Sequence, residues 1–203
     1  MLIVLALLAI QPTFSQKEGV RVIDASNAKS IELDASAIFQ VNVTVHDSQE
    51  VIITTRSEGE FSADVVITHK TRAERIVLGT AFQPAFKDHN DKLSAHKVVS
   101  FAMDLQVPKD KILHMESDIA NVYLEGSLPI FKAYLQSGFC KLKGFYGEAE
   151  VVTQKGAIEL LTNSGIIQGE SKNGKVTIDA MPMGDNKISL KTIDGDIRVI
   201  RTQ

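Results

Sequence analysis

From residue 120 onward the sequence repeats with a period of eighteen residues, and this repeat restricts the chain to a small set of architectures. One alanine and four glycines mark the repeat, the last of them after twenty-one residues: Ala120, Gly138, Gly156, Gly174 and Gly195. An apolar residue lies two positions after each: Val122, Cys140, Ile158, Val176 and Ile197. Another lies four positions after each: Leu124, Leu142, Leu160, Ile178 and Val199. A short fixed period of this kind is typical of stacked, solenoid-like proteins.

The local pattern inside each copy predicts strands rather than helices. Apolar and polar residues alternate, as in Ile158-Glu159-Leu160, which places one set of side chains on the buried face of a strand. A glycine inside a helix costs about 1 kcal/mol, whereas Ser137-Gly138 and Asp194-Gly195 are typical turn dipeptides. Crossovers between parallel strands are right-handed in nearly all proteins. We therefore predict an all-β fold: a single-stranded β-helix or β-solenoid, right-handed, with rungs of about 18 residues.

The longer spacing before Gly195 implies three extra residues in the fourth rung. We place them in an outward bulge near Met181-Pro182-Met183-Gly184-Asp185. We expect the rungs to stack in chain order, so that the copy beginning at Gly195 forms one end of the stack. There Arg198, Arg201 and the polar tail would discourage pairing with another edge. The N-terminal β region would cap the other end.

Before the repeat, strand signals recur with irregular spacing of about ten residues. The segments alternate or are rich in β-branched residues, and polar turn clusters separate them: 31–33, 39–45, 51–55, 65–67, 76–78 and 97–107. We divide the chain into a signal peptide (1–15), an N-terminal β region (16–107) and a β-helical repeat region (108–203). Because no linker-like segment separates the last two, we expect residues 16–203 to form one structural domain with a continuous core.

The first ten residues, MLIVLALLAI, are shorter than the ~20 apolar residues needed to span a bilayer. Small residues at Thr13 and Ser15 suit cleavage after Ser15, so we predict a signal peptide. No Lys or Arg precedes the apolar run, and a start upstream of Met1 would explain that. The alternative is an N-terminal strand buried in the core. We expect the mature chain to be exported to the periplasm or outer cell surface, without a stable transmembrane segment.

Composition and spacing argue against several functions. The net charge is −3 and no basic stripe is present, so nucleic acid is not an expected partner. Cys140, the only cysteine, occupies an inward column and is expected to be buried rather than nucleophilic. No histidine pair has metal-ligand spacing: His46, His69, His89, His96 and His114. The segment around His89 has two alternatives, a metal-binding loop and an ordinary solvent-exposed loop, and the second is favoured. We predict no catalytic, cofactor-binding or metal-binding residues and no cofactor.

Outward positions of neighbouring rungs carry opposite charges. Lys141 is expected beside Glu159, and Glu125 beside Lys143, which is typical of a solvated sheet face with paired charges. Three aromatic residues near one predicted corner leave two alternatives open, a surface that binds glycan or protein and a set of side chains that fills the core: Phe139, Phe145 and Tyr146.

Several segments carry a resemblance to a known family: Phe14-Ser15-Gln16, Ile31 to Ser36, Asp91 to His96, Lys155 to Leu160 and Asp194 to Val199. Together they resemble the bacterial "putative adhesin" family, which is related to the auto-transporter adhesin head GIN domain proteins of Bacteroidetes. The resemblance implies an exported β-helical protein and brings no catalytic residues with it. A fold does not by itself fix a function.

We therefore expect an exported, non-enzymatic β-solenoid at the cell envelope that acts as an adhesin or as a protein- or glycan-binding surface. One alternative is a periplasmic envelope-stress or signalling module that binds a partner protein. Another is a carbohydrate-active β-helix enzyme, which would show two carboxylates facing each other in a groove.

Overall fold

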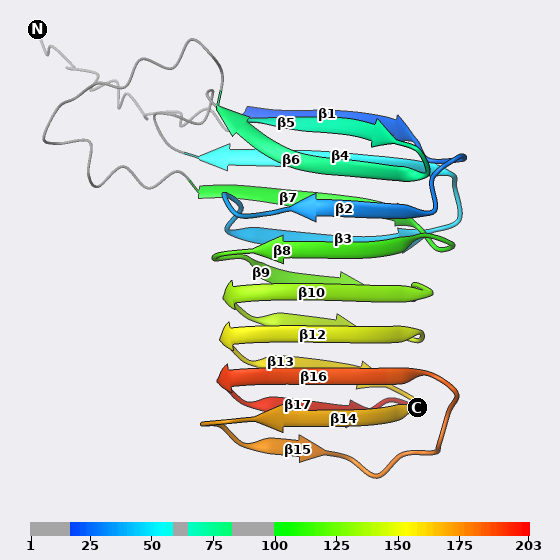
Figure 1. Cartoon of the computed structure of the whole chain (residues 1–203), viewed down its shortest axis with the longest axis vertical. Coiled ribbons are helices and arrows are strands. Elements are labelled where there is room, and N and C mark those ends of the chain that lie inside the picture. The colour runs from blue at the N-terminus through cyan, green and yellow to red at the C-terminus, as the bar shows by residue number, and fades with distance from the viewer. Residues whose placement is uncertain (1–16, 59–64, 83–99) are drawn as a thin grey trace, which may run out of the picture.

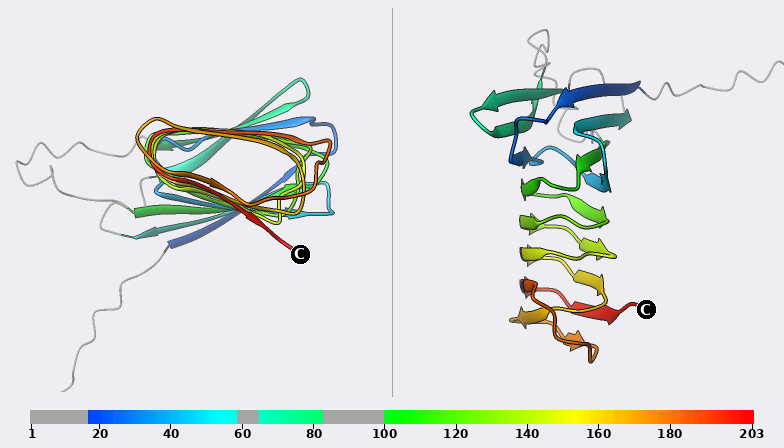
Figure 2. Two further views of the ribbon diagram at one scale, coloured as in Figure 1. Left: turned by 90° about the horizontal axis from the view of Figure 1, so that it is seen from below. Right: turned by 90° about the vertical axis from the view of Figure 1, so that its right-hand side faces the viewer.

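The computed structural model describes residues 17–58, 65–82 and 100–203, and every regular element in these ranges is a β-strand. The all-β prediction is therefore confirmed. The strands form two sheets that face each other along the length of the molecule (Figures 1 and 2). The predicted signal peptide (1–15), His89, His96 and the segment Asp91 to His96 lie outside the described residues.

The first sheet, sheet A, has nine strands. In spatial order they are β1 (Lys17–Asp24), β4 (Glu50–Glu58), β7 (Ser100–Pro108), β3 (Gln40–His46), β9 (Asn121–Glu125), β11 (Cys140–Lys143), β13 (Ile158–Thr162), β17 (Ile197–Arg201) and β15 (Val176–Ile178).

The second sheet, sheet B, has eight strands. In spatial order they are β14 (Ile166–Ser171), β16 (Lys187–Asp194), β12 (Glu148–Lys155), β10 (Ile130–Ser137), β8 (Ile112–Ser117), β2 (Ser30–Asp34), β6 (Arg75–Phe82) and β5 (Val65–Arg72).

From β8 onward the chain alternates between sheet B and sheet A, and each strand pairs in parallel with its neighbours in the same sheet. We call one sheet B strand and the sheet A strand that follows it a rung. The registers reproduce the eighteen-residue period, since Cys140 lies opposite Val122 on one side and Ile158 on the other. The repeat in the sequence is thus a repeat of strand positions in both sheets.

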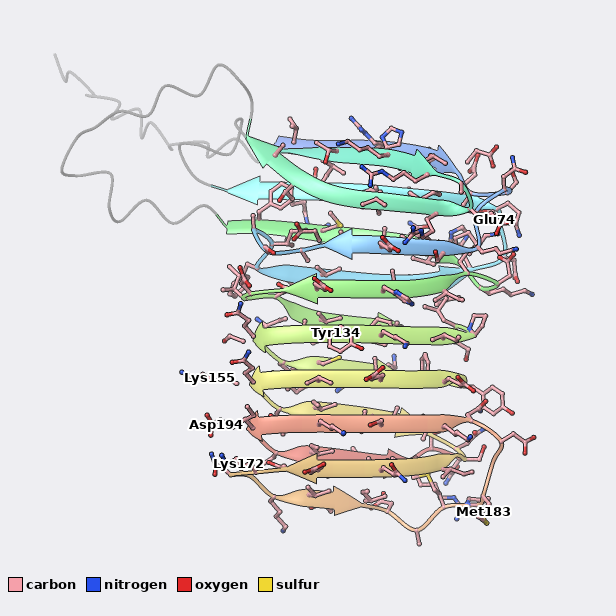
Figure 3. The ribbon with its side chains drawn as sticks, viewed as in Figure 1. Glu74, Tyr134, Lys155, Lys172, Met183 and Asp194 are labelled. Atoms are coloured by element: carbon pink, nitrogen blue, oxygen red, sulfur yellow. The ribbon has the colours of Figure 1, made fainter. Side chains whose placement is uncertain are left out.

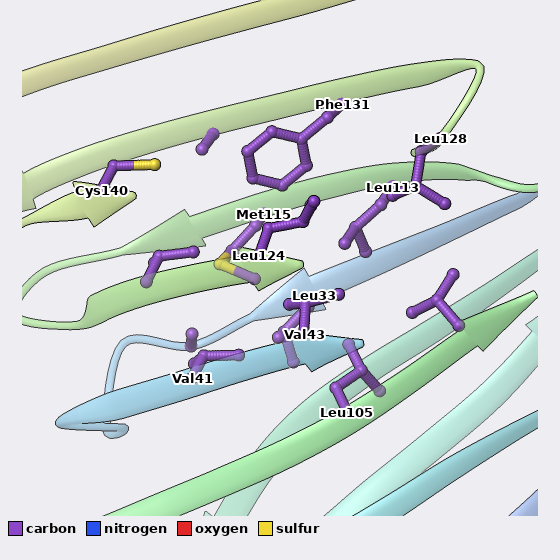
Figure 4. Packing of buried hydrophobic residues seen from close by; sticks show 14 of the residues in the cluster. Leu33, Val41, Val43, Leu105, Leu113, Met115, Leu124, Leu128, Phe131 and Cys140 are labelled. Atoms are coloured by element: carbon purple, nitrogen blue, oxygen red, sulfur yellow. The ribbon is translucent and has the colours of Figure 1, made fainter. Parts of the chain in front are cut away.

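The core lies between the two sheets and is built from the inward half of each strand (Figure 4). Alternation with period two puts Val122 and Leu124 inside and exposes Tyr123 between them. Phe131 and Phe145 are fully buried, and their ring centroids are 6.4 Å apart with the rings tilted, a favourable aromatic geometry.

The N-terminal strands extend the same two sheets. β2 lies between β6 and β8, and β3 lies between β7 and β9, all in parallel. Beyond them the pairing becomes antiparallel. In sheet A, β4 pairs with β7 on one side and with β1 on the other, and in sheet B, β5 forms a hairpin with β6. Arg21 Nη1 on β1 lies 3.0 Å from His69 Nδ1 on β5, so a side-chain contact joins the last strands of the two sheets at this end.

The expected stacking in chain order is wrong at the other end. β17 pairs with β13 on one side and β15 on the other, and β16 lies between β12 and β14. The rung that is last in the sequence is therefore inserted, and β14–β15 forms the end of the stack (Figure 1). The extra residues near Met183 belong to the loop 179–186, which returns the chain from the end rung to the inserted one.

The repeated glycines stack on one edge of the molecule, where the chain turns from sheet B to sheet A. A Cβ atom added at Gly138 would lie 2.1 Å from the carbonyl oxygen of Ala120, and one added at Gly156 would lie 1.8 Å from that of Gly138. The turns therefore approach each other more closely than a side chain allows. The column continues in spatial order, with Gly195 against Gly156 and Gly174 against Gly195.

Candidate functional site

A groove of about 640 Å³ runs along the edge where the chain turns from sheet A to sheet B. It is the candidate functional site, and its size is in the range of ordinary ligand pockets. Turns after four sheet A strands and the end of the loop before β16 form its walls. Six residues carry most of its chemistry: His46, Asp47, Lys109, Asp110, Tyr146 and Asn186.

The floor of the groove is apolar and tightly packed. Leu128 is buried, and a Cβ atom added at Gly147 would lie 1.9 Å from the Leu128 carbonyl oxygen. Gly126 makes a similar approach to the side chain of Val45, at 2.8 Å from an added Cβ. These short turns keep side chains out of the space between rungs, and this leaves the groove open.

Tyr146 gives the groove an exposed aromatic ring. Its side chain is 51% exposed, and its backbone N–H donates to Ser127 Oγ at 3.2 Å. Ser127 Oγ in turn donates to the carbonyl oxygen of Gly144 at 3.4 Å. The backbone of Tyr146 is therefore fixed to the neighbouring turn while about half of the residue stays exposed, and tyrosines of this kind are common at binding surfaces.

One end of the groove is charged. Lys109 Nζ lies 2.6 Å from Asp47 Oδ1, and the hydrogen bond from Lys109 lowers the pKa of the Asp47 carboxyl. Lys111, whose side chain is buried, donates to Asp110 Oδ2 at 2.9 Å and lowers the pKa of that carboxyl in the same way. Both carboxyls are therefore held in the ionised form at neutral pH.

Two groove residues carry buried polar atoms without a hydrogen-bond partner among the described residues: His46 Nε2 and Asn186 Nδ2. The other ring nitrogen of His46 lies 3.0 Å from Ser48 Oγ. A buried polar atom left without a partner costs about 1–3 kcal/mol. Both residues line the groove, but these two atoms themselves are covered, so a molecule in the groove reaches them only if a neighbouring group moves.

The three aromatic residues near Gly144 do not form one surface. Phe145 is buried and packs on Phe131, as the core-filling alternative expects. Phe139 precedes β11 at the opposite edge, where its ring centroid lies 5.8 Å from that of Tyr123. Only Tyr146 lines the groove.

The expected charge pairs on the outer face of sheet A are confirmed. Lys141 Nζ lies 2.6 Å from Glu159 Oε1, and Lys143 Nζ lies 2.8 Å from Glu125 Oε1. The inserted rung changes the next neighbour, because Glu159 faces Arg198 rather than Thr177. Exposed pairs of this kind contribute little to stability and mainly prevent repulsion between like charges.

The loop around His89, the one segment considered for metal binding, lies outside the described residues, and the three described histidines lie on different strands. His46 lies in the groove, His69 contacts Arg21, and His114 is on β8 with its side chain half-buried. Across residues 17–58, 65–82 and 100–203 no group of three or more His, Cys, Asp or Glu side chains is arranged to hold a metal ion. In the same ranges no helix is long and apolar enough to cross a membrane.

Cys140 is fully buried, as its place in the column predicts, and burial raises the pKa of its thiol to about 12. We expect the thiol to resist alkylation at pH 8 in the folded protein and to react fully in denaturant, since only the thiolate is reactive. We expect Cys140→Ser to lower the free energy of unfolding by about 1–3 kcal/mol, because its hydroxyl enters an apolar site. Thiol labelling followed by mass spectrometry tests the expected resistance to alkylation, and urea unfolding tests the expected loss of stability. Rapid labelling of the native protein would contradict the buried position.

The groove itself was not predicted. Its residues are separated by up to 141 positions in the sequence, from Val45 to Asn186, and meet only because five turns stack on one edge. The sequence contains one sign of these turns. A further glycine lies six residues after two of the repeat positions: Gly126 after Ala120, and Gly144 after Gly138. Both begin the short turns that border the groove.

Comparison with known proteins is informative at the level of structure. No family model and no curated protein matches the sequence. A solved structure described as a "putative cell adhesion protein", from Clostridium sporogenes, superposes with a TM-score of 0.64 and 11% identity. The superposition covers 93% of this chain and all of that one.

Two further structures carry a similar description. A "putative adhesin" from Bacteroides fragilis is 13% identical, with a TM-score of 0.39 over 95% of this chain and all of that one. Another from Parabacteroides merdae is 11% identical, with a TM-score of 0.30 over 91% of this chain and 97% of that one. The first of the three superpositions shows that the chain has the fold of the Clostridium sporogenes "putative cell adhesion protein", and its resemblance to the "putative adhesin" family is confirmed at the level of the fold.

Proposed function

We propose that the protein is an exported, non-enzymatic β-solenoid that acts at the cell envelope as an adhesin, with the edge groove as its binding site for protein or glycan. In this proposal the described strands form a single-stranded, right-handed β-helix, residues 16–203 are one domain, and residues 1–15 are a signal peptide. The final location is the periplasm or the outer cell surface.

The observation that carries the proposal is the groove. It combines an apolar floor at Leu128, an exposed residue at Tyr146, and the charged side chains of Asp47, Lys109 and Asp110. These features suit an extended ligand that stacks on the ring and supplies hydrogen bonds at intervals. The description of the Clostridium protein as a cell adhesion protein supports the same class of function.

The charges in the groove do not suit glycoside cleavage. Such cleavage needs one carboxyl with a raised pKa as general acid. The two carboxyls that line the groove among the described residues have lowered pKa values instead, Asp47 because of Lys109 and Asp110 because of Lys111. A non-enzymatic role is therefore the better fit for this groove.

A matched pair of tyrosine variants tests the proposal. We expect the purified protein to capture a ligand on a glycan array or from an envelope protein extract, and Tyr146→Ala to weaken that binding about tenfold or more, as for an aromatic anchor. Tyr134, which is 40% exposed on the outer face of sheet B and away from the groove, provides the control (Figure 3). Tyr134→Ala is expected to bind like the unmodified protein.

Three results would count against the proposal. Absence of binding to both glycans and envelope proteins would contradict an adhesin. Equal weakening by Tyr146→Ala and Tyr134→Ala would show that the groove is not the site. Turnover of a bound glycan would contradict the non-enzymatic role. Unfolding curves of both variants check that neither loss reflects a misfolded protein, since each side chain is exposed.

A further inference from the structure

The two sheets end together at the rung β14–β15. Among the described strands, β14 pairs only with β16, and β15 pairs only with β17. Each strand therefore presents a second edge with backbone N–H and C=O groups available for pairing. Exposed edges of this kind readily bind another strand unless they are blocked. Neither described strand contains proline, and neither is covered by another described element.

The interior of the stack is only partly covered at this end, where Met181 of the loop 179–186 packs against the core. Val176 and Ile178 occupy the inward columns but are 37% and 41% exposed, whereas Cys140 and Leu142 in the same columns are fully buried. On β14 the inward positions hold Ile167, which is partly buried against the core, then Gly169 and Ser171. Gly169 contributes no side chain and packs against Val176 and Ile178. Apolar side chains at the end of the core thus remain in contact with solvent, as is typical of an association surface.

Charge on the end rung is separated along the strands. The turn 172–175, between β14 and β15, holds Lys172 and Lys175 and no acid. The loop 179–186, at the other end of β15, holds Asp179 and Asp185 and no base. Figure 3 shows the two ends, with Lys172 at one side of the rung and Met183 at the other. All four charged side chains are exposed.

We infer that this end of the stack binds a second copy of the chain, with β14 antiparallel to the partner's β14 and β15 antiparallel to the partner's β15. A two-fold axis perpendicular to the sheets produces this pairing and is the ordinary symmetry of a homodimer. It places the turn 172–175 of each copy, the lysine turn, over the loop 179–186 of the other copy, the aspartate loop. A two-fold axis parallel to the strands pairs β14 with the partner's β15 and places lysine turn over lysine turn. The charges therefore select the first arrangement.

A second copy also fits the shape of the surface. The end offers two antiparallel edges on opposite sides of one core, about 10 Å apart, as facing sheets are. A single extended peptide covers one edge and leaves the other, together with Val176 and Ile178, exposed. Another end rung covers both edges at once and completes the core between them. The opposite end of this chain is different, because Arg21 and His69 join its last strands.

Sedimentation velocity of the purified protein tests the inference. We expect a species with twice the mass of one chain at micromolar concentration. Reversing the lysine turn with Lys172→Glu and Lys175→Glu is expected to weaken the dimer about tenfold or more, because like charges then face each other. Adding Asp179→Lys and Asp185→Lys in the same chain exchanges the two signs and is expected to restore the dimer.

Lys155→Glu is the control, since Lys155 lies on the same edge but in an inner rung (Figure 3), and it should leave the dimer unchanged. Ile178→Lys, which adds a charge to the apolar surface, should also disrupt the dimer. A monomer at all concentrations would overturn the inference, as would a dimer insensitive to both variants. A dimer that the lysine reversal leaves unchanged but that Ile178→Lys disrupts would show the other two-fold arrangement, because each reversed turn would still face its own copy there. Growth into long polymers would show head-to-tail contact instead.

Discussion

Replacing Gly138 by alanine is expected to lower the free energy of unfolding by about 4 kcal/mol or more, one of the two largest effects predicted for this protein. Two costs combine at this position. Its φ angle of +125° is one that residues with a Cβ atom rarely adopt, and the added Cβ would lie 2.1 Å from the Ala120 carbonyl oxygen. Relief requires the two turns to separate, which disturbs β9 and β11 together.

The variant Gly144→Ala measures the cost of the backbone conformation without the cost of the steric contact. Gly144 also has a positive φ angle, +60°, but no atom of the described residues lies within 4 Å of its added Cβ. Backbone conformation alone is therefore expected to lower stability by about 1–2 kcal/mol there. Urea unfolding followed by circular dichroism measures both variants. Similar losses at Gly138 and Gly144 would show that close stacking of the turns is not what requires glycine at Gly138.

Phe131→Ala is expected to lower the free energy of unfolding by about 3–5 kcal/mol. Phe131 is fully buried on β10 and packs against Phe145, so removing its ring leaves a cavity between the two sheets (Figure 4). Phe131→Leu, which fills most of the space, should lose much less. Thermal and urea unfolding of the three proteins measure the differences.

Tyr134→Ala on the same strand is the control for Phe131→Ala. Its side chain points to the opposite face and is 40% exposed, so we expect a change within about 1 kcal/mol. Equal losses at Phe131 and Tyr134 would contradict the assignment of inward and outward faces on β10. A small loss at Phe131 alone would show that the core collapses around the missing ring.

The inward and outward faces of the strands could be predicted because period-two alternation is a local property. Val122 and Leu124 are buried for the same reason that Tyr123 is exposed, and the same reasoning placed Cys140 in the core. The stacking order of the last rungs could not be predicted from these columns. Val176 and Ile197 are both apolar and β-branched, so either one fits next to Ile158.

Other positions carried information about the order. The middle inward position of β14, between Ile167 and Ser171, is Gly169, which cannot fill its part of an inner layer of the core and therefore suits an end rung. On the outward face of sheet A, Glu159 lies beside the opposite charge of Arg198 when β17 is the neighbour of β13. With β15 as the neighbour, Glu159 would lie beside the uncharged Thr177. Both signals favour β17 over β15 as the neighbour of β13. Each depends on comparing alternative pairings, which a search for a regular repeat does not do.

The candidate site was less predictable than the fold because it is made of turns. His46 and Tyr146 are 100 residues apart and contribute to one groove only after several rungs have stacked. Nothing in the local sequence around either residue indicates the other. The charged end of the groove is similar, since Asp47 meets Lys109 across two separate turns.

The inserted rung also determines when this end of the molecule can form. In a simple repeat protein each unit docks on the one before it, so structure grows along the chain as it is made. Here β15 finds its neighbour in β17, and β13 must wait for Ile197, 39 residues after Ile158. Closing that longer loop precedes any gain from pairing. The last two rungs are thus expected to form together, and only once residues 187–201 have been synthesised.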